Sequence, residues 1–363
     1  MISRRLALSL LGLSCLAAMP ALAAPQDGLA RLREALDQVP ALLLDSPAPV
    51  QGAFVQLSAL SLVAGAPGPW DPATLRRAVV GGEITPLATL GQVGVERWTA
   101  PAGVAPQQVE AMFGLGRGLA LWRLADEAAA GAVMAHLRGR GFRAEGEALV
   151  DPGPVPLMDR MSDPWRSLPG PSAVLQQGAS LLQLQDAAAA AQLRDQPAAT
   201  SRPALEVALQ GIAARGGAGG LVQAVLLSPV LANPPADPAV LLQGGMEAAR
   251  KALAEPPAAF PTWQAGLMAD LAGPGRAGLV VALGYADCDK AKRAAAEMGE
   301  RWRRLAGPGG AAAQTALLAG EGVAKGACAA LLQVEGAPDG PRNPFFETVW
   351  NALMRRQPTP FGG

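Results

Sequence analysis

Residues 278–305 read GLVVALGYADCDKAKRAAAEMGERWRRL, and this stretch sets the pattern for the chain. Its first part is a short apolar run that ends at Tyr285, and its second part repeats small and apolar residues at steps of three and four. This change of period is typical of a strand that leads into an amphipathic helix. Asp287 stands at the junction, where its carboxylate can accept a hydrogen bond from a backbone N–H of the first helical turn. We therefore expect a strand, a capped helix start and a helix with one buried face.

A similar phrase occurs twice more, and each copy ends in an aspartate before an alanine-rich segment. Residues 119–126 read LALWRLAD and end at Asp126, and residues 181–186 read LLQLQD and end at Asp186. The intervals between the three aspartates are unequal, so a solenoid of fixed period is excluded. The order of the expected strands and helices resembles a ferredoxin-like arrangement, in element order only.

Composition supports a globular chain of about two domains. The chain has 363 residues, of which 50% are hydrophobic and only 4% aromatic, so its cores should consist of closely apposed elements with small side chains. We predict an α+β fold with two α/β sandwich (ferredoxin-like βαβ) modules of mostly antiparallel sheet and helices on one face. The expected division is a signal peptide (1–24), an N-terminal α/β region (25–112), a first sandwich module (113–232), a Pro-rich linker with a helix (233–262), a second sandwich module (263–342) and a C-terminal amphipathic helix and tail (343–363).

The N-terminal half is harder to divide into elements than the rest. Partial alternation of apolar residues predicts strands at 54–63 and 92–98, and Pro106 predicts one or two helical turns over 106–113.

The glycine-rich residues 114–118 precede an expected strand. Phosphate-binding loops run from a strand through glycine to a helix N-terminus, so this order disfavours a nucleotide site.

The first 24 residues have the features of a secretory signal peptide. Arg4 and Arg5 are followed by an apolar stretch and by Ala21-Leu22-Ala23, a small-x-small cleavage pattern. The alternative of a membrane anchor is disfavoured because Pro20 interrupts the stretch and no basic flank follows it. Ser3-Arg4-Arg5 leaves open whether export follows the general or the twin-arginine route. We predict a periplasmic or secreted protein with no stable membrane span after processing.

Export leaves two cysteines in a compartment that favours disulfides. Cys288 follows the strand end, and Cys328 begins an apolar run that can pair beside that strand. We predict a disulfide between Cys288 and Cys328, with two buried thiols as the alternative.

The whole chain has 30 basic and 30 acidic residues, and loss of two arginines with the signal peptide makes it slightly acidic. A chain with this charge balance has no net electrostatic attraction to nucleic acid or to anionic lipid, so we expect neither as a partner.

No recognisable reaction centre, cofactor motif or metal-ligand spacing is present. His136 is the only histidine, and no Cys, His or Glu stands near it at ligand spacing, so a packed or surface histidine is the simpler interpretation. Asp126, Asp186 and Asp287 are the candidate site residues, and helix capping explains all three. We predict no cofactor, no catalytic residue and no metal.

Two functional hypotheses follow. The first is an exported, non-catalytic envelope protein that binds a partner or small ligand. The alternative is a periplasmic hydrolase that uses carboxylates at strand-to-helix corners, with Asp126 or Asp287 as the base. A single pocket that gathers two of these aspartates with raised pKa values would favour the hydrolase.

Overall fold

The computed structural model describes most of the chain beyond its N-terminal segment. The predicted signal peptide (1–24) and almost all of the predicted linker (233–262) lie outside the described residues. The described ranges are 28–46, 48–64, 70–79, 84–116, 118–151, 153, 156–168, 171–188, 193, 196–216, 220–232 and 260–362.

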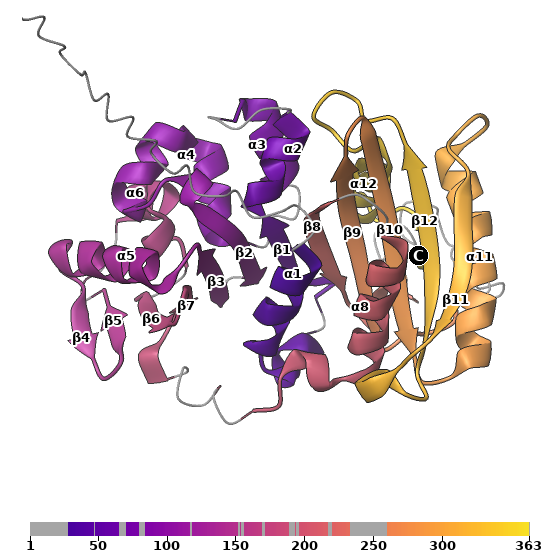
Figure 1. The fold of residues 1–363 in the computed structure, drawn as a ribbon, viewed down its shortest axis with the longest axis horizontal. Helices are drawn as coiled ribbons and strands as arrows, with labels where there is room; N and C mark the ends of the chain where they lie inside the picture. The colour runs from indigo at the N-terminus through magenta and orange to yellow at the C-terminus, as the bar shows by residue number, and fades with distance from the viewer. Residues whose placement is uncertain are drawn as a thin grey trace, which may run out of the picture.

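One sheet of 12 strands runs across the described chain (Figure 1). Its order is β11-β12-β10-β9-β8-β1-β2-β3-β7-β6-β5-β4, and every neighbouring pair is antiparallel. The strands are β1 (Val50–Gln56), β2 (Val109–Leu115), β3 (Leu119–Leu124), β4 (Arg143–Glu145), β5 (Ala148–Val150), β6 (Ala173–Gln177), β7 (Ser180–Leu184), β8 (Gly220–Leu227), β9 (Ala265–Gly273), β10 (Arg276–Tyr285), β11 (Ala313–Ala319) and β12 (Cys328–Gly336).

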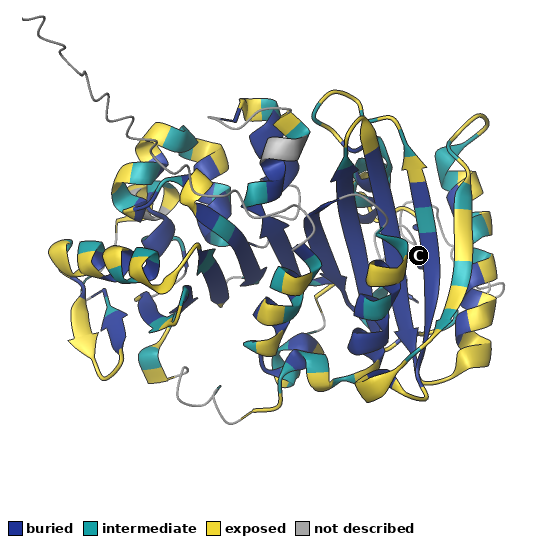
Figure 2. Ribbon diagram, viewed as in Figure 1, coloured by how far each residue is buried: buried dark blue, intermediate teal, exposed yellow. Residues whose placement is uncertain are grey.

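Helices cover both faces of the sheet, so the prediction of helices on one face is wrong. The central strands are buried on both sides (Figure 2), because their alternate side chains enter different cores. In β10, Val280 and Ala282 belong to one core, while Val281 and Leu283 belong to another on the opposite face. The α-helices are α1 (Gly28–Asp37), α2 (Leu60–Ala64), α3 (Pro72–Val79), α4 (Thr85–Ala102), α5 (Glu127–Gly139), α6 (Leu157–Ser162), α8 (Pro203–Arg215), α11 (Cys288–Ala306) and α12 (Pro344–Met354).

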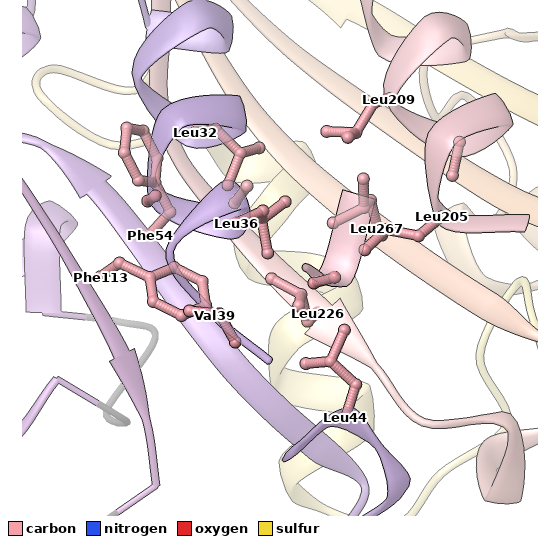
Figure 3. Packing of buried hydrophobic residues seen from close by; sticks show 14 of the residues in the cluster. Leu32, Leu36, Val39, Leu44, Phe54, Phe113, Leu205, Leu209, Leu226 and Leu267 are labelled. Carbon is pink, nitrogen blue, oxygen red and sulfur yellow. The ribbon is translucent and has the colours of Figure 1, made fainter. Parts of the chain in front are cut away.

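The first face is covered by α1 and α8, and the second by other helices of each half. Leucines of α1 and α8 pack on β1, β2, β8 and β9 (Figure 3). On the other face, α2 to α5 pack over the N-terminal strands, and α11 and α12 pack over the C-terminal strands. The 3₁₀ helices are η2 (Ala41–Asp45), η3 (Leu57–Ala59), η4 (Pro106–Gln108), η5 (Pro164–Arg166), η6 (Ala199–Ser201), η7 (Pro229–Leu231) and η8 (Gly322–Ala324).

The strand order shows that the fold contains an internal repeat. From the centre outward, one half has β1, β2, β3, β7 and β6, and the other has β8, β9, β10, β12 and β11. In each half a helix of the first face precedes the central strand (α1 and α8), and a helix of the second face follows the third strand (α5 and α11). The two copies meet at the antiparallel β1–β8 pair, where Phe54 lies opposite Ala224. An approximate two-fold axis therefore passes through this pair.

The mixed α+β class is confirmed, but the ferredoxin-like sandwich modules are not. The two copies share one continuous sheet through β1 and β8, so no gap separates two sandwiches at this point. The first copy carries three additions, which are α2 to α4 between β1 and β2, the hairpin β4–β5 after α5, and α6 with η5 before β6.

Three predicted elements of the N-terminal half differ from the structure, one in type and two in extent. The strand expected at 92–98 lies inside α4, which consists of two helical stretches that meet at Gly94 (φ 78°, ψ 167°); Leu90 of the first and Trp98 of the second are buried. Of the strand expected at 54–63, only residues 54–56 are in a strand, and the residues after Gln56 form η3 and α2. The helical turns expected at 106–113 stop after η4, and β2 follows because β1 and β3 supply partners on both sides.

A buried ion pair joins α3 and α12 to the middle of the sheet. The Asp270 carboxylate of β9 is 0% exposed and accepts hydrogen bonds from Arg77 Nε (2.9 Å) and Arg77 Nη2 (2.5 Å). It also accepts from Gln223 Nε2 (3.0 Å) and Asn343 Nδ2 (2.7 Å). Asn343 in turn caps α12 through the N–H groups of its first turn. The carboxylate of Asp270 is thus paired with a cation and hydrogen-bonded within the core.

Candidate functional site

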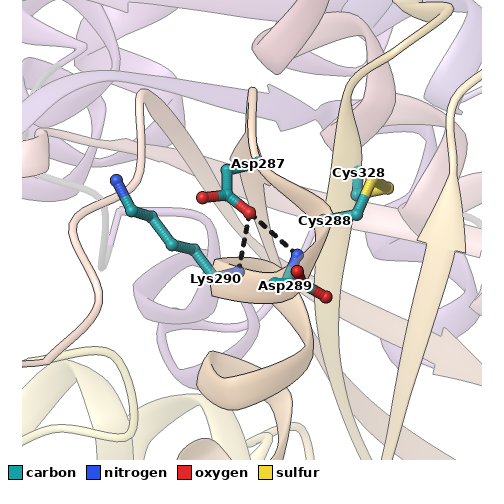
Figure 4. Close-up of a disulfide and its surroundings, with 5 residues drawn as sticks. All are labelled: Asp287, Cys288, Asp289, Lys290 and Cys328. Atoms are coloured by element: carbon teal, nitrogen blue, oxygen red, sulfur yellow. Dashed lines mark hydrogen bonds between the residues drawn. A yellow bond between two sulfur atoms is a disulfide. The ribbon is translucent and has the colours of Figure 1, made fainter.

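The three candidate aspartates each accept hydrogen bonds from nearby backbone N–H groups. Asp126 caps α5 and accepts from Ala129 N (2.7 Å). Asp287 caps α11 and accepts from the N–H groups of residues 289 (2.9 Å) and 290 (3.1 Å), as Figure 4 shows. Asp186 accepts from Ala188 N (2.9 Å). For Asp126 and Asp287 these contacts are the capping arrangement that satisfies free N–H groups at a helix start.

The structure does not bring these aspartates together. Asp126 and Asp287 occupy equivalent corners of the two repeats, since each follows the third strand of its half, whereas Asp186 follows β7 and is not equivalent. The pKa of Asp287 is lowered, chiefly by the backbone N–H of Lys290. A general base near neutral pH needs a raised pKa instead. The corners therefore give no geometric support to the hydrolase alternative.

The predicted pairing of Cys288 with Cys328 is present as a disulfide (Figure 4). It joins the first residue of α11 to the first residue of β12, and Cys328 lies opposite Tyr285 in the β10–β12 ladder. Cys288 is therefore bonded, and the bond fixes the start of α11 to the sheet.

His136 contacts the end of α4. It is half-buried in α5, and its imidazole lies so close to Gly103 that a β-carbon at that position would overlap the ring. Among the described residues, no group of three or more His, Cys, Asp or Glu side chains is arranged to hold a metal ion. His136 thus packs against the left-handed glycine that terminates α4.

An apolar cavity lies on the first face, at the end of the sheet where β2 turns into β3. It measures about 420 Å³, within the range of small-ligand sites. The η2 segment forms one wall, the β2–β3 turn another, and Leu184 at the end of β7 contributes to the floor. The described lining residues are Leu43, Ser46, Ala48, Pro49, Val50, Gln51, Leu115, Gly116, Gly118, Leu119, Leu184, Leu193 and Met354.

The described part of this lining is mostly apolar. None of the described residues around the cavity carries an ionisable side chain. The two polar side chains are engaged in shaping the wall, since Gln51 Nε2 donates to the carbonyls of Leu44 and Ser46, and Ser46 Oγ accepts from Ala48 N (3.2 Å). The described lining residues therefore offer an apolar molecule contact and burial rather than charge pairing.

Sequence reasoning missed this cavity because its lining comes from four separate parts of the chain. The one local signal was the glycine-rich segment 114–118, where Gly116 adopts a positive φ of 52° in the β2–β3 turn. Its flanking leucines, Leu115 and Leu119, form a cross-strand pair and both face the cavity.

Comparisons with models of known protein families, with curated proteins and with solved structures found no match. Among the described helices, none combines the length and apolar character needed to cross a membrane.

Proposed function

We propose that the mature chain is an exported, non-catalytic binding protein of the cell envelope and that the apolar cavity holds a small apolar ligand. The observation that carries this proposal is a cavity of about 420 Å³ whose described lining is leucine-rich and uncharged. Burial of apolar ligand surface would supply the binding free energy, at roughly 25 cal/mol per Å² before the costs of association.

Export is supported by two features. The N-terminal segment has the charged, apolar and small-x-small regions of a signal peptide. The Cys288–Cys328 disulfide is of a kind that persists in oxidising compartments outside the cytosol. Mass spectrometry of the processed chain tests this part of the proposal, because cleavage after Ala23 or Ala24 would remove the segment.

Ligand binding is tested with N-phenylnaphthylamine, an apolar dye that fluoresces in dry sites. We expect saturable binding of about one equivalent by the mature chain. Ala48 is exposed at the rim and lines the cavity, so Ala48→Trp should fill the mouth and weaken binding at least tenfold without disturbing the fold.

The matched control is Ala296→Trp, which adds the same side chain to the exposed face of α11, away from the cavity. This variant should bind like the parent. Equal binding by both tryptophan variants and the parent, or the absence of saturable binding, would refute the apolar site.

A further inference from the structure

The internal repeat has a second hollow at the position that corresponds to the apolar cavity. This second cavity, of about 290 Å³, lies beside the β9–β10 turn, the end of α8 and the end of β12. The apolar cavity lies beside the β2–β3 turn, the segment after α1 and the end of β7. These elements are equivalent in the two halves of the strand order, so the fold creates a hollow twice.

The two hollows are lined by residues of different chemistry. In the first, Leu119 and Leu184 form a cross-strand pair that faces the cavity. In the second, a cross-strand pair that lines the cavity is Gly278 and Glu335, of which only the charged residue has a side chain. Arg276 adds a charge of opposite sign two residues before Gly278, on the same face of β10.

Arg276 and Glu335 are diagonal neighbours across β10 and β12, about 7–8 Å apart at their Cα atoms by the geometry of such pairs. Both are exposed, and neither forms an ion pair with another described residue. Glu335 Oε1 accepts one hydrogen bond from Gln333 Nε2 (2.6 Å), which leaves its second oxygen for another partner. The rim thus presents a cation and an anion side by side.

The floor between these charges is apolar. Leu271 lines it on the first face, Ala272 and Ala277 also border the cavity, and the glycines at 216, 273 and 278 add no side chain. A ligand that satisfies every lining group therefore carries a carboxylate for Arg276, an ammonium for Glu335 and a short apolar chain for the floor.

We propose that the second cavity is a binding site for a small zwitterion with an apolar chain, such as an aliphatic amino acid. The guanidinium of Arg276 binds the carboxylate, and the carboxylate of Glu335 binds the ammonium. The site is distinct from the apolar cavity, and the two halves of the repeat thereby bind different classes of small molecule.

The test compares four probes with six-carbon chains by NMR titration of the mature chain. Norleucine is the zwitterion, hexanoate the anion, hexylamine the cation and hexanol the neutral molecule. We expect norleucine to bind most tightly and to shift the backbone amides of residues 275–278 and 335. Hexanoate, hexylamine or hexanol binding at these amides as tightly as norleucine would overturn the proposal.

Charge variants make the test specific. Because both groups are exposed, each contact should contribute the small binding free energy that is typical of exposed ion pairs. Arg276→Ala and Glu335→Gln should therefore each weaken norleucine binding about three- to fivefold. Glu335→Gln should instead strengthen hexanoate binding, since it removes a neighbouring negative charge. The matched controls are Arg143→Ala and Glu145→Gln, two exposed strand positions in β4 at the opposite edge of the sheet.

The control variants should bind norleucine like the parent. Norleucine affinity that is unchanged in both Arg276→Ala and Glu335→Gln would refute the site. Ala48→Trp should leave norleucine binding intact, so failure at this cavity is distinguishable from failure at the apolar cavity.

Discussion

Replacement of Asp270 by alanine should cause a large loss of stability. The carboxylate lies in the middle of the sheet, is 0% exposed, and is the only acidic partner that the described structure gives to the guanidinium of Arg77. Alanine would leave that guanidinium buried beside a cavity, with Gln223 and Asn343 each losing a hydrogen bond.

The expected loss of stability is that of a buried ion pair from which one partner is removed. Removal of one partner of a buried ion pair costs about 3–5 kcal/mol, because the other charge stays in a low-dielectric environment. The loss should appear as a decrease of this size in the free energy of unfolding, measured by urea denaturation at pH 7 with tryptophan fluorescence.

Two further variants make the measurement decisive. Asp339→Ala removes an ion pair with Arg342 in which the Asp339 side chain is 73% exposed, and it should change the unfolding free energy by less than about 0.5 kcal/mol. Arg77→Met combined with Asp270→Leu removes both charges, and it should be more stable than Asp270→Ala alone. A loss below about 1 kcal/mol in Asp270→Ala would refute the role assigned to the buried pair.

Three other perturbations test the account of the fold. Mutation of Cys288 and Cys328 to serine should lower the free energy of unfolding by about 4 kcal/mol in the chain-entropy model for a separation of 40 residues, as urea denaturation would show. Asp287→Ala should reduce stability at pH 7, and the difference from the parent should shrink as the pH falls below 4, because the lowered pKa of Asp287 gives a contribution that is present above its unfolded pKa and lost on protonation; a constant difference would contradict it. Gly284→Ala should lower the thermal midpoint, because its β-carbon would overlap a backbone carbonyl of α8, whereas Gly139→Ala, which meets no atom within 4 Å, should not.

The C-terminal half could be predicted well from the sequence because its signals are local. The run 279–283 forms the middle of β10, and the steps of three and four in residues 291–305 place Met298 and Trp302 in the core as expected. The capping role of Asp287 also follows from residue type and position alone.

The N-terminal half was harder because tertiary contacts override weak local patterns. Residues 92–98 alternate valine with polar residues and glycine, which imitates a strand, but burial of Trp98 against Trp122 fixes them as part of α4. The single sheet could not be foreseen either, since the pairing of β1 with β8 joins segments about half the chain apart.

The cavities depend on this long-range order. Leu43 and Met354 line the same hollow although they come from opposite ends of the described chain. No local period encodes such a site, and only the repeat in strand order reveals that two hollows correspond.

A crystal structure of the mature chain with bound N-phenylnaphthylamine tests the central claim most directly. The account predicts density for the dye between η2 and the β2–β3 turn, in contact with Leu115, Leu119 and Leu184. An empty cavity at saturating dye, or density for the dye only at another surface, would contradict it.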